Sequence, residues 1–145
     1  MKKFQNKSSQ CLISVAPMMR WTDKNCRYFH RQISKHAFLY TEMIPVNAII
    51  YGENYKYLDH NSEEHPLAIQ LGGSDPYLLG KATKMASKAG FDEINLNVGC
   101  PSNKVKSGNF GACLMKDPKL VGRCLSTMNK NTDRQISVKC RIGVD

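Results

Sequence analysis

The sequence predicts an α/β fold of parallel βα units, either an open doubly wound sheet or the front part of a barrel. Three observations predict it. Short apolar runs alternate with amphipathic segments along the 145 residues, and such alternation is typical of parallel strands joined by helices. The segment 93–98 alternates with the period of a strand. The segment 76–89 keeps a helical period and has capping residues at both ends.

The first elements are a short strand at 11–15, a helix, and a second short strand at 38–41. Pro17 ends the first strand, because proline cannot donate to a strand ladder. Thr22 or Asp23 can cap the helix, which runs through residues 26–33. The segment 44–57 reads as a helix or loop that packs over the barrel.

A third strand covers residues 66–71, with Gln70 at its end and two glycines after it. The next helix has the clearest signals in the chain. Asp75 is a good N-cap, Pro76 occupies the first helical position, and Gly90 is a natural C-cap. Lysines occupy the face of this helix opposite the apolar residues.

The fourth strand has one apolar and one polar side. The apolar side consists of Ile94, Leu96 and Val98, and the polar side of Glu93, Asn95 and Asn97. The apolar side needs a cover, whereas the polar side faces something other than a hydrocarbon core. The strand runs into Gly99, Cys100 and Pro101, a turn that suits an active site at the carboxyl end of a barrel strand. A buried structural cysteine is the alternative.

The last elements are a helix that starts at Asp117 and Pro118 and a fifth strand at 136–139. Five strands do not close an eight-stranded barrel, which typically needs about 250 residues. The expected organisation is a basic N-terminal tail at 1–11 and one incomplete domain at 12–145. An incomplete barrel would leave two unpaired strand edges, which favour aggregation.

The formal net charge of +9 makes a polyanion a plausible partner. Nucleic acid is favoured over a membrane, because no apolar run is long enough to span a bilayer. A basic enzyme without a polyanionic partner stays open. The six cysteines form no Cys-x-x-Cys pair and the four histidines no His-x-x-x-His pair, so we expect no metal site. The N-terminus lacks the apolar region of a secretory signal, and we expect a cytoplasmic protein with reduced thiols.

Each predicted strand delivers a polar or unusual group at its carboxyl end. These groups are Pro17, Met18 and Met19, then Glu42, Gln70, Asn97 with Cys100, and finally Lys139 with Arg141. In a parallel barrel all these ends open on one face. Together they suggest a platform for a flavin-type ring, with Lys139 beside an electron-rich reduced ring. Each residue also has a structural interpretation: Gln70 could satisfy neighbouring backbone, Lys139 could pair with Glu42 or Glu93, and the methionines could be packing residues.

Six motifs resemble the tRNA-dihydrouridine synthases. They are Ala-Pro-Met at 16–18, Tyr-Thr-Glu-Met at 40–43, Gln-Leu-Gly-Gly at 70–73, Asn-Val-Gly-Cys-Pro-Ser at 97–102, Gly-Ala-Cys-Leu-Met at 111–115 and Val-Lys-Cys-Arg-Ile-Gly at 138–143. The run from Glu93 to Ser102 is very specific to this family. Residues 20–23 and 25–29 resemble its A-type bacterial subfamily, which acts on uridines of the D-loop. The resemblance covers the chain from about Ile13 onward but only the front half of the family's length.

The resemblance implies an FMN-binding TIM (β/α)8 barrel, here truncated to about the first five βα units, which a small helical tRNA-binding domain would follow. The implied reaction reduces the C5=C6 bond of uracil in the D-loop of tRNA, with NADPH as reductant of the flavin. By the family match Cys100 is the catalytic proton donor, so its thiol must carry a proton. Pro17, Met18 and Met19 match the segment under the flavin, Gln70 and Lys139 match its polar contacts, and Asn97 matches a position that touches the target nucleotide.

Other expectations concern the loop after Cys100 and the missing part of the barrel. Lys104 and Lys106 are candidates for phosphate contacts, although an ordinary solvated loop is slightly favoured. The loops after strands seven and eight commonly hold the flavin phosphate, so we expect this polypeptide alone to bind FMN weakly and to have little or no activity. Two alternatives stay open: another FMN-barrel reductase that acts on a pyrimidine, and an inactive truncated remnant with residual RNA binding.

Overall fold

The computed structural model describes residues 13–52, 54–102, 105 and 108–143. Their centre is a four-stranded sheet with the order β1-β2-β3-β4. The strands are β1 (Leu39–Pro45), β2 (Leu67–Gly72), β3 (Glu93–Val98) and β4 (Gln135–Cys140). Every neighbouring pair is parallel, as the alternation of strands and helices predicts.

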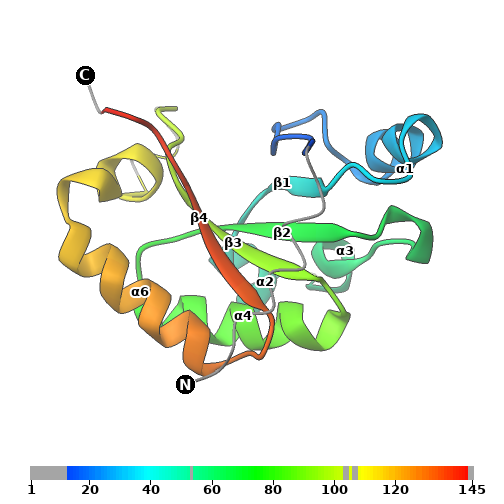
Figure 1. Ribbon diagram of the computed structural model, residues 1–145. Coiled ribbons are helices and arrows are strands. Elements are labelled where there is room, and N and C mark those ends of the chain that lie inside the picture. Colours follow the sequence, from blue (N-terminus) through cyan, green and yellow to red (C-terminus); the bar gives the residue numbers. More distant parts are fainter. Residues whose placement is uncertain (1–12, 53, 103–104, 106–107, 144–145) are drawn as a thin grey trace.

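Helices join these strands. They are α1 (Lys24–Ile33), α2 (Val46–Tyr51), α3 (Asn54–Leu58), α4 (Pro76–Ala89) and α6 (Pro118–Lys130), with the 3₁₀ turns η2 (Ser62–Glu64) and η3 (Gly111–Lys116). The connecting helices α2, α4 and α6 lie on the same side of the sheet (Figure 1). A doubly wound sheet reverses its strand order and carries helices on both faces. Sequential order with one-sided helices is instead the arrangement of consecutive units of a βα barrel, although the described strands do not close one.

The apolar side of β3 is covered, as the alternating pattern requires. Ile94 and Leu96 have no exposed surface, and Val98 is 3% exposed. They belong to one core cluster with the buried residues of the covering helices, among them Leu79 of α4 and Met128 of α6. This packing accounts for the amphipathic patterns of both helices. The opposite face of the sheet carries polar side chains, and the candidate site lies at the carboxyl ends of its strands.

The predicted helix caps are confirmed. The Asp23 carboxylate accepts a hydrogen bond from the Cys26 amide at 2.8 Å. Asp75 caps α4 through the amides of Tyr77 and Leu78, and Asp117 caps α6. Gly90 ends α4 with φ of 103°, a left-handed conformation that favours glycine. These local signals fixed the ends of three helices because capping involves only residues within one turn.

Two strand predictions need correction. Of the expected first strand at 11–15, residues 11–12 lie outside the described residues, and Ser14 forms only a single parallel bridge to Phe38. The described sheet therefore has four strands, not five. The second strand continues to Pro45 instead of ending at Thr41, because its pairing with β2 resumes at Met43 after an irregularity. The segment 44–57, left open as helix or loop, ends β1 and then forms α2 and α3.

Helix α1 buries charge and exposes apolar side chains. Arg27 and Arg31 are 5% and 8% exposed, whereas Phe29 and Ile33 are 62% and 69% exposed. The reason lies in η2, where Glu64 is completely buried and accepts from Arg27. The two arginines thus face the protein because a buried carboxylate and backbone carbonyls there need donors.

The described part of the chain contains no helix that is long and apolar enough to span a membrane. Within the same residues, no three histidine, cysteine or acidic side chains come together in a way that could hold a metal ion.

Candidate functional site

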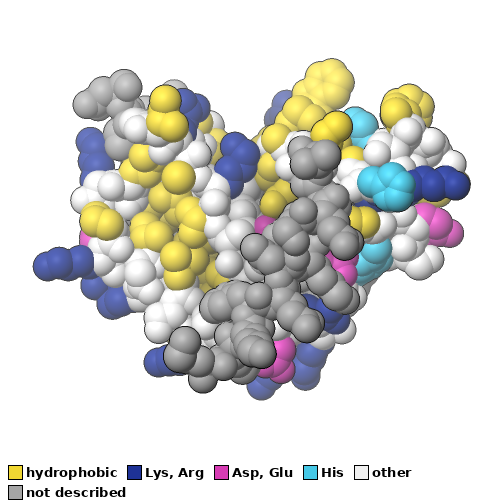
Figure 2. Space-filling model, viewed as in Figure 1, with side chains coloured by type: hydrophobic (Ala, Val, Ile, Leu, Met, Phe, Trp, Pro, Cys, Tyr) yellow, Lys and Arg dark blue, Asp and Glu magenta, His cyan; other side chains and the backbone are white. Residues whose placement is uncertain are grey.

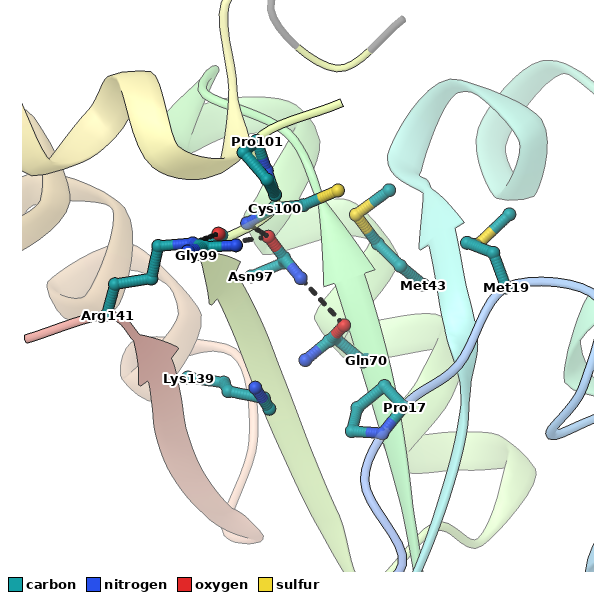
Figure 3. A pocket seen from close by; sticks show the side chains of 10 residues that line it. All are labelled: Pro17, Met19, Met43, Gln70, Asn97, Gly99, Cys100, Pro101, Lys139 and Arg141. Carbon is teal, nitrogen blue, oxygen red and sulfur yellow. Dashed lines mark hydrogen bonds between the residues drawn. The ribbon is translucent and has the colours of Figure 1, made fainter. Parts of the chain in front are cut away.

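A pocket of about 210 Å³ opens where the carboxyl ends of the strands meet (Figure 3). It is lined by Pro17, Met19, Met43, Gln70, Asn97, Gly99, Cys100, Pro101, Lys139 and Arg141. These residues come from all four strands or from the segments next to them, together with the loop before α1. The pocket thus occupies the position at which parallel βα folds place their ligands.

The pocket brings together most of the residues that the sequence predicted as site residues. Pro17, Met19, Gln70, Asn97, Cys100 and Lys139 all line it. Met18 is not among the lining residues; its backbone amide and carbonyl both bond to the Thr22 hydroxyl, at 3.0 and 3.1 Å. Lys104 and Lys106 lie outside the described residues. The functional role of each predicted residue stays a prediction.

Met43 and Arg141 also line the pocket. Arg141 was named with Lys139 among the groups at the strand ends, whereas Met43 appeared only as part of a motif. Met43 reaches the pocket because β1 extends beyond its predicted end. Arg141 follows β4 directly, and its Nε donates to the Gly99 carbonyl at 2.6 Å. For Arg141, the signal in the sequence was a charged residue directly after a strand of the predicted parallel sheet.

The turn that carries Cys100 is held by several hydrogen bonds. The Asn97 side-chain oxygen accepts from the amides of Gly99 and Cys100, at 3.2 and 3.0 Å. The Cys100 carbonyl accepts from Ala112 at 3.0 Å. Gly111 lies so close that an added Cβ would approach this carbonyl to 2.6 Å. The Cys100 backbone is therefore fixed, while its half-buried thiol contacts only the Ser102 hydroxyl, at 3.5 Å, among the hydrogen bonds of the described residues.

The apolar side of the pocket depends on the loop 17–22. Within this loop, the amides of Trp21 and Thr22 donate to the Met18 carbonyl. From outside it, Arg27 donates to the Thr22 carbonyl at 2.8 Å, and the same guanidinium pairs with Glu64 at 2.6 Å. This contact with a buried ion pair anchors the loop that brings Pro17 and Met19 to the pocket.

The polar side of the pocket is rich in hydrogen-bond donors. Asn97 Nδ2 donates to Gln70 Oε1 at 2.9 Å, and the cationic Lys139 and Arg141 stand beside these amides (Figure 3). Among the described hydrogen bonds, the Gln70 amide group bonds to the Asn95 and Asn97 side chains and not to backbone, contrary to its structural interpretation. The carboxylates suggested as partners of Lys139 have other partners, since Glu42 accepts from the Arg20 amide and Glu93 from Tyr40.

This arrangement combines an apolar wall, a donor-rich floor and a thiol at the rim. An apolar wall with methionines suits a flat ring, because thioethers pack well on aromatic surfaces. Amide N–H groups and cations suit carbonyl oxygens on the edge of such a ring. The thiol can supply a proton to an atom bound above the floor.

Fold and pocket together place the chain among parallel βα proteins whose ligand site lies at the carboxyl ends of the strands. The sequence model described as Dihydrouridine synthase (Dus) matches residues 14–145. The chain therefore belongs to the dihydrouridine synthase family.

Similar proteins bear the name tRNA-dihydrouridine(20/20a) synthase. The protein of Vibrio parahaemolyticus serotype O3:K6 is 56% identical over 135 residues, which are 93% of this chain and 41% of that protein. That of Xanthomonas axonopodis pv. citri is 56% identical over 133 residues, 92% of this chain and 40% of its own length. That of Synechocystis sp. is 53% identical, with the same shares covered. The chain thus spans about two fifths of the length of the curated relatives it matches.

Proposed function

We propose that this chain is the front part of the catalytic domain of a tRNA-dihydrouridine synthase, which reduces uridine to 5,6-dihydrouridine in the D-loop of tRNA. The names of its relatives specify positions 20 and 20a, and we propose the same uridines here. The observation that carries the proposal is the pocket itself, which Cys100 lines together with Gln70, Asn97 and Lys139.

The residues of the pocket fit the isoalloxazine ring of FMN. Amide N–H groups of Gln70 and the Lys139 ammonium would meet the carbonyl edge of the ring, and Pro17 and Met19 would lie along its flat surface. FMN, when bound and reduced by NADPH, supplies the hydride. A positive charge at Lys139 favours a ring that gains electron density.

Cys100 would complete the reduction as general acid. Saturating the C5=C6 bond takes a hydride at one carbon and a proton at the other, so the thiol gives up its proton and is later reprotonated from solvent. The hydrogen bonds around Gly99 and Cys100 fix the backbone but leave the thiol at the pocket rim. Such fixed geometry is what positioning a proton donor requires.

The partner in this proposal is tRNA. The target uracil must leave its stack to reach a pocket at the end of the strands, which costs a few kcal/mol and requires contacts elsewhere on the RNA. Asn97 is the residue we propose to touch the target nucleotide. The net charge of +9 favours the approach of a polyanion.

We further propose that the remaining strands of a longer protein close the barrel beside β4. Figure 2 shows hydrophobic side chains gathered over β4 and the adjoining part of α6, and Val138 of this strand is 36% exposed. The pocket of about 210 Å³ is also smaller than the ~300–1,000 Å³ typical of small-molecule sites. Both features suit a site that further strands complete.

The 145-residue chain by itself is therefore expected to bind FMN weakly. It supplies part of the ring site but not the loops after strands seven and eight that commonly grip the phosphate. Titration of the purified chain with FMN, followed by flavin fluorescence, measures this affinity. FMN that stays bound in stoichiometric amount through gel filtration would contradict the expectation.

Deletion of the gene for this chain tests the function. We expect dihydrouridine at positions 20 and 20a to disappear from tRNA of the deletion strain, as measured by mass spectrometry of tRNA fragments. Restoration of the gene should bring it back. An unchanged dihydrouridine content would favour the reductase of a free pyrimidine or the inactive remnant instead.

A further inference from the structure

A continuous chain of hydrogen bonds runs along the polar face of the sheet from β3's first residue to the Cys100 turn. Glu93 Oε1 accepts from the Ser137 hydroxyl. Ser137 Oγ accepts from Asn95 Nδ2 at 2.7 Å, and Asn95 Oδ1 accepts from Gln70 Nε2 at 2.7 Å. Gln70 Oε1 accepts from Asn97 Nδ2 at 2.9 Å, and Asn97 Oδ1 accepts from the Cys100 amide at 3.0 Å. We call these five side chains (Glu93, Ser137, Asn95, Gln70 and Asn97) the relay.

The relay has one direction, which its two ends impose. A carboxylate only accepts hydrogen bonds, so Ser137 must donate to Glu93. The Ser137 oxygen then accepts from the NH₂ group of Asn95. The orientation of the Asn95 amide in turn determines the orientations of the Gln70 and Asn97 amides. At the other end, backbone N–H groups only donate, so Asn97 must present its oxygen to the turn. Both ends therefore demand the same orientation of all three amides.

A second donor strengthens the carboxylate end. The Tyr40 hydroxyl donates to Glu93 at 3.0 Å. Burial, followed by the nearby Glu93 charge, raises the pKa of this phenol, which keeps its proton on the oxygen. Glu93 thus accepts hydrogen bonds from two hydroxyl groups. Because its carboxylate cannot donate a hydrogen bond, the direction of the relay cannot be reversed at this end.

Burial makes the direction costly to reverse. Gln70 and Asn95 are 1% and 2% exposed, and Glu93 and Asn97 are 5% and 7% exposed. Water therefore cannot replace the partners of a flipped amide, and an unpaired buried polar group is strongly disfavoured. Reversal would also break the bonds from Asn97 to the Gly99 and Cys100 amides.

We propose that Glu93 and Ser137 are positioning residues that fix which atoms of Gln70 and Asn97 face the pocket. Each NH₂ group has two N–H donors, and the relay uses one from each amide. Among the hydrogen bonds of the described residues, the second N–H of Gln70 and of Asn97 has no acceptor and is left for a ligand, so the floor presents donors to carbonyl oxygens. The proposal rests on the proposed function only in naming the flavin and uracil rings as the groups thus selected.

The test compares Ser137→Ala with two other variants. Ser137→Ala removes the hydroxyl that joins Asn95 to Glu93, while Ser137→Thr keeps a hydroxyl on a residue type that strands favour. Ser87→Ala is the matched control, since Ser87 is also half-buried and accepts one side-chain hydrogen bond, from Thr132 at 2.8 Å. The first readout is backbone amide exchange at Gly99 and Cys100 in the protein from the native gene without ligand, with the global unfolding free energy measured in parallel.

Ser137→Ala is expected to accelerate exchange at Gly99 and Cys100 by about threefold, because the loss of one link weakens the cooperative chain behind the acceptor of these amides. Ser137→Thr should restore the wild-type rates, and Ser87→Ala should leave them unchanged. Equal rates in Ser137→Ala and Ser87→Ala at similar global stability would overturn the relay. If Ser137→Ala does not fold, Ser137→Cys decides, because a thiol of similar size is a weaker donor and acceptor than the hydroxyl. Faster exchange at Gly99 and Cys100 in Ser137→Cys would support the relay, and wild-type rates would overturn it.

A second readout separates the relay from the proposed function. FMN titration of the protein from the native gene, with and without Ser137→Ala, should show weaker binding in the variant and no change in Ser87→Ala. Accelerated amide exchange without any FMN binding by wild type would retain the relay and reject the flavin site. FMN binding by wild type with unchanged exchange in Ser137→Ala would do the opposite.

Discussion

Replacement of Cys100 by alanine in the native gene is expected to lower dihydrouridine formation by roughly 10²–10⁴-fold, the usual contribution of a general acid. The thiol stands at the pocket rim on a turn whose backbone is held by Asn97 and Ala112. Removing its proton donor leaves those hydrogen bonds in place, so the floor of the pocket keeps its shape. Single-turnover reduction of unmodified tRNA by the prereduced enzyme measures the rate.

Two further variants test whether the effect is specific to the Cys100 thiol. Cys26→Ala removes another half-buried thiol, one that lies on α1 and contacts His30 at 3.4 Å, and it should leave the rate unchanged. Cys100→Ser keeps the size of the side chain but offers a much weaker acid, so it should fail like alanine. Binding of tRNA should survive in all three variants. A Cys100→Ala enzyme with the wild-type rate would refute the role of the thiol.

Much of the fold could be predicted because its signals are local. Asp75, Pro76 and Gly90 mark the ends of α4 through contacts within one turn, and the alternation along β3 follows from one covered face. The order of the strands was not accessible in this way. The alternation of strands and helices left both a doubly wound sheet and a barrel open, and the family resemblance implied the barrel. The sequential strand order and the helices on one side of the sheet agree with the barrel arrangement (Figure 1).

The site residues that could be predicted are those at the carboxyl ends of the predicted strands. Gln70, Asn97, Cys100 and Lys139 end or follow strands, and parallel strands bring their carboxyl ends together. The hydrogen-bond partners of the site residues were not predictable, because they depend on the register in which neighbouring strands pair. Ser137 meets Asn95 since these two residues pair across β3 and β4, and nothing near Ser137 in the sequence indicates this contact.

The burial of side chains on helix α1 was not predictable either, because it depends on a residue that is distant in the sequence. The sequence predicted a helix here, but in the structure its apolar Phe29 is exposed and its charged Arg27 is buried. The cause is Glu64, which lies 37 residues further along the chain and pairs with Arg27. A buried carboxylate far away in the sequence thus overrides the local hydrophobic pattern.

Replacement of Glu64 by alanine is expected to destabilise the chain by about 3–5 kcal/mol, the usual cost of removing one partner of a buried ion pair. Glu64 is fully buried, and its carboxylate accepts from Arg27 Nε at 2.6 Å and from the Asn61 amide at 2.8 Å. The substitution leaves the buried Arg27 charge without its partner. Urea unfolding, followed by circular dichroism, measures the loss.

The neighbouring Glu63→Ala is the matched control, because Glu63 is exposed and bonds only to the adjacent Ser62 hydroxyl among the described hydrogen bonds. Such a surface change should stay within about 0.5 kcal/mol. The double variant Arg27→Met with Glu64→Leu should recover much of the stability, since apolar residues of similar volume often replace a buried pair without loss. It should still loosen the loop 17–22, which loses the bond from Arg27 to Thr22. FMN affinity is therefore expected to fall in the double variant even where its stability returns, and equal affinity would show that the ion pair serves stability alone.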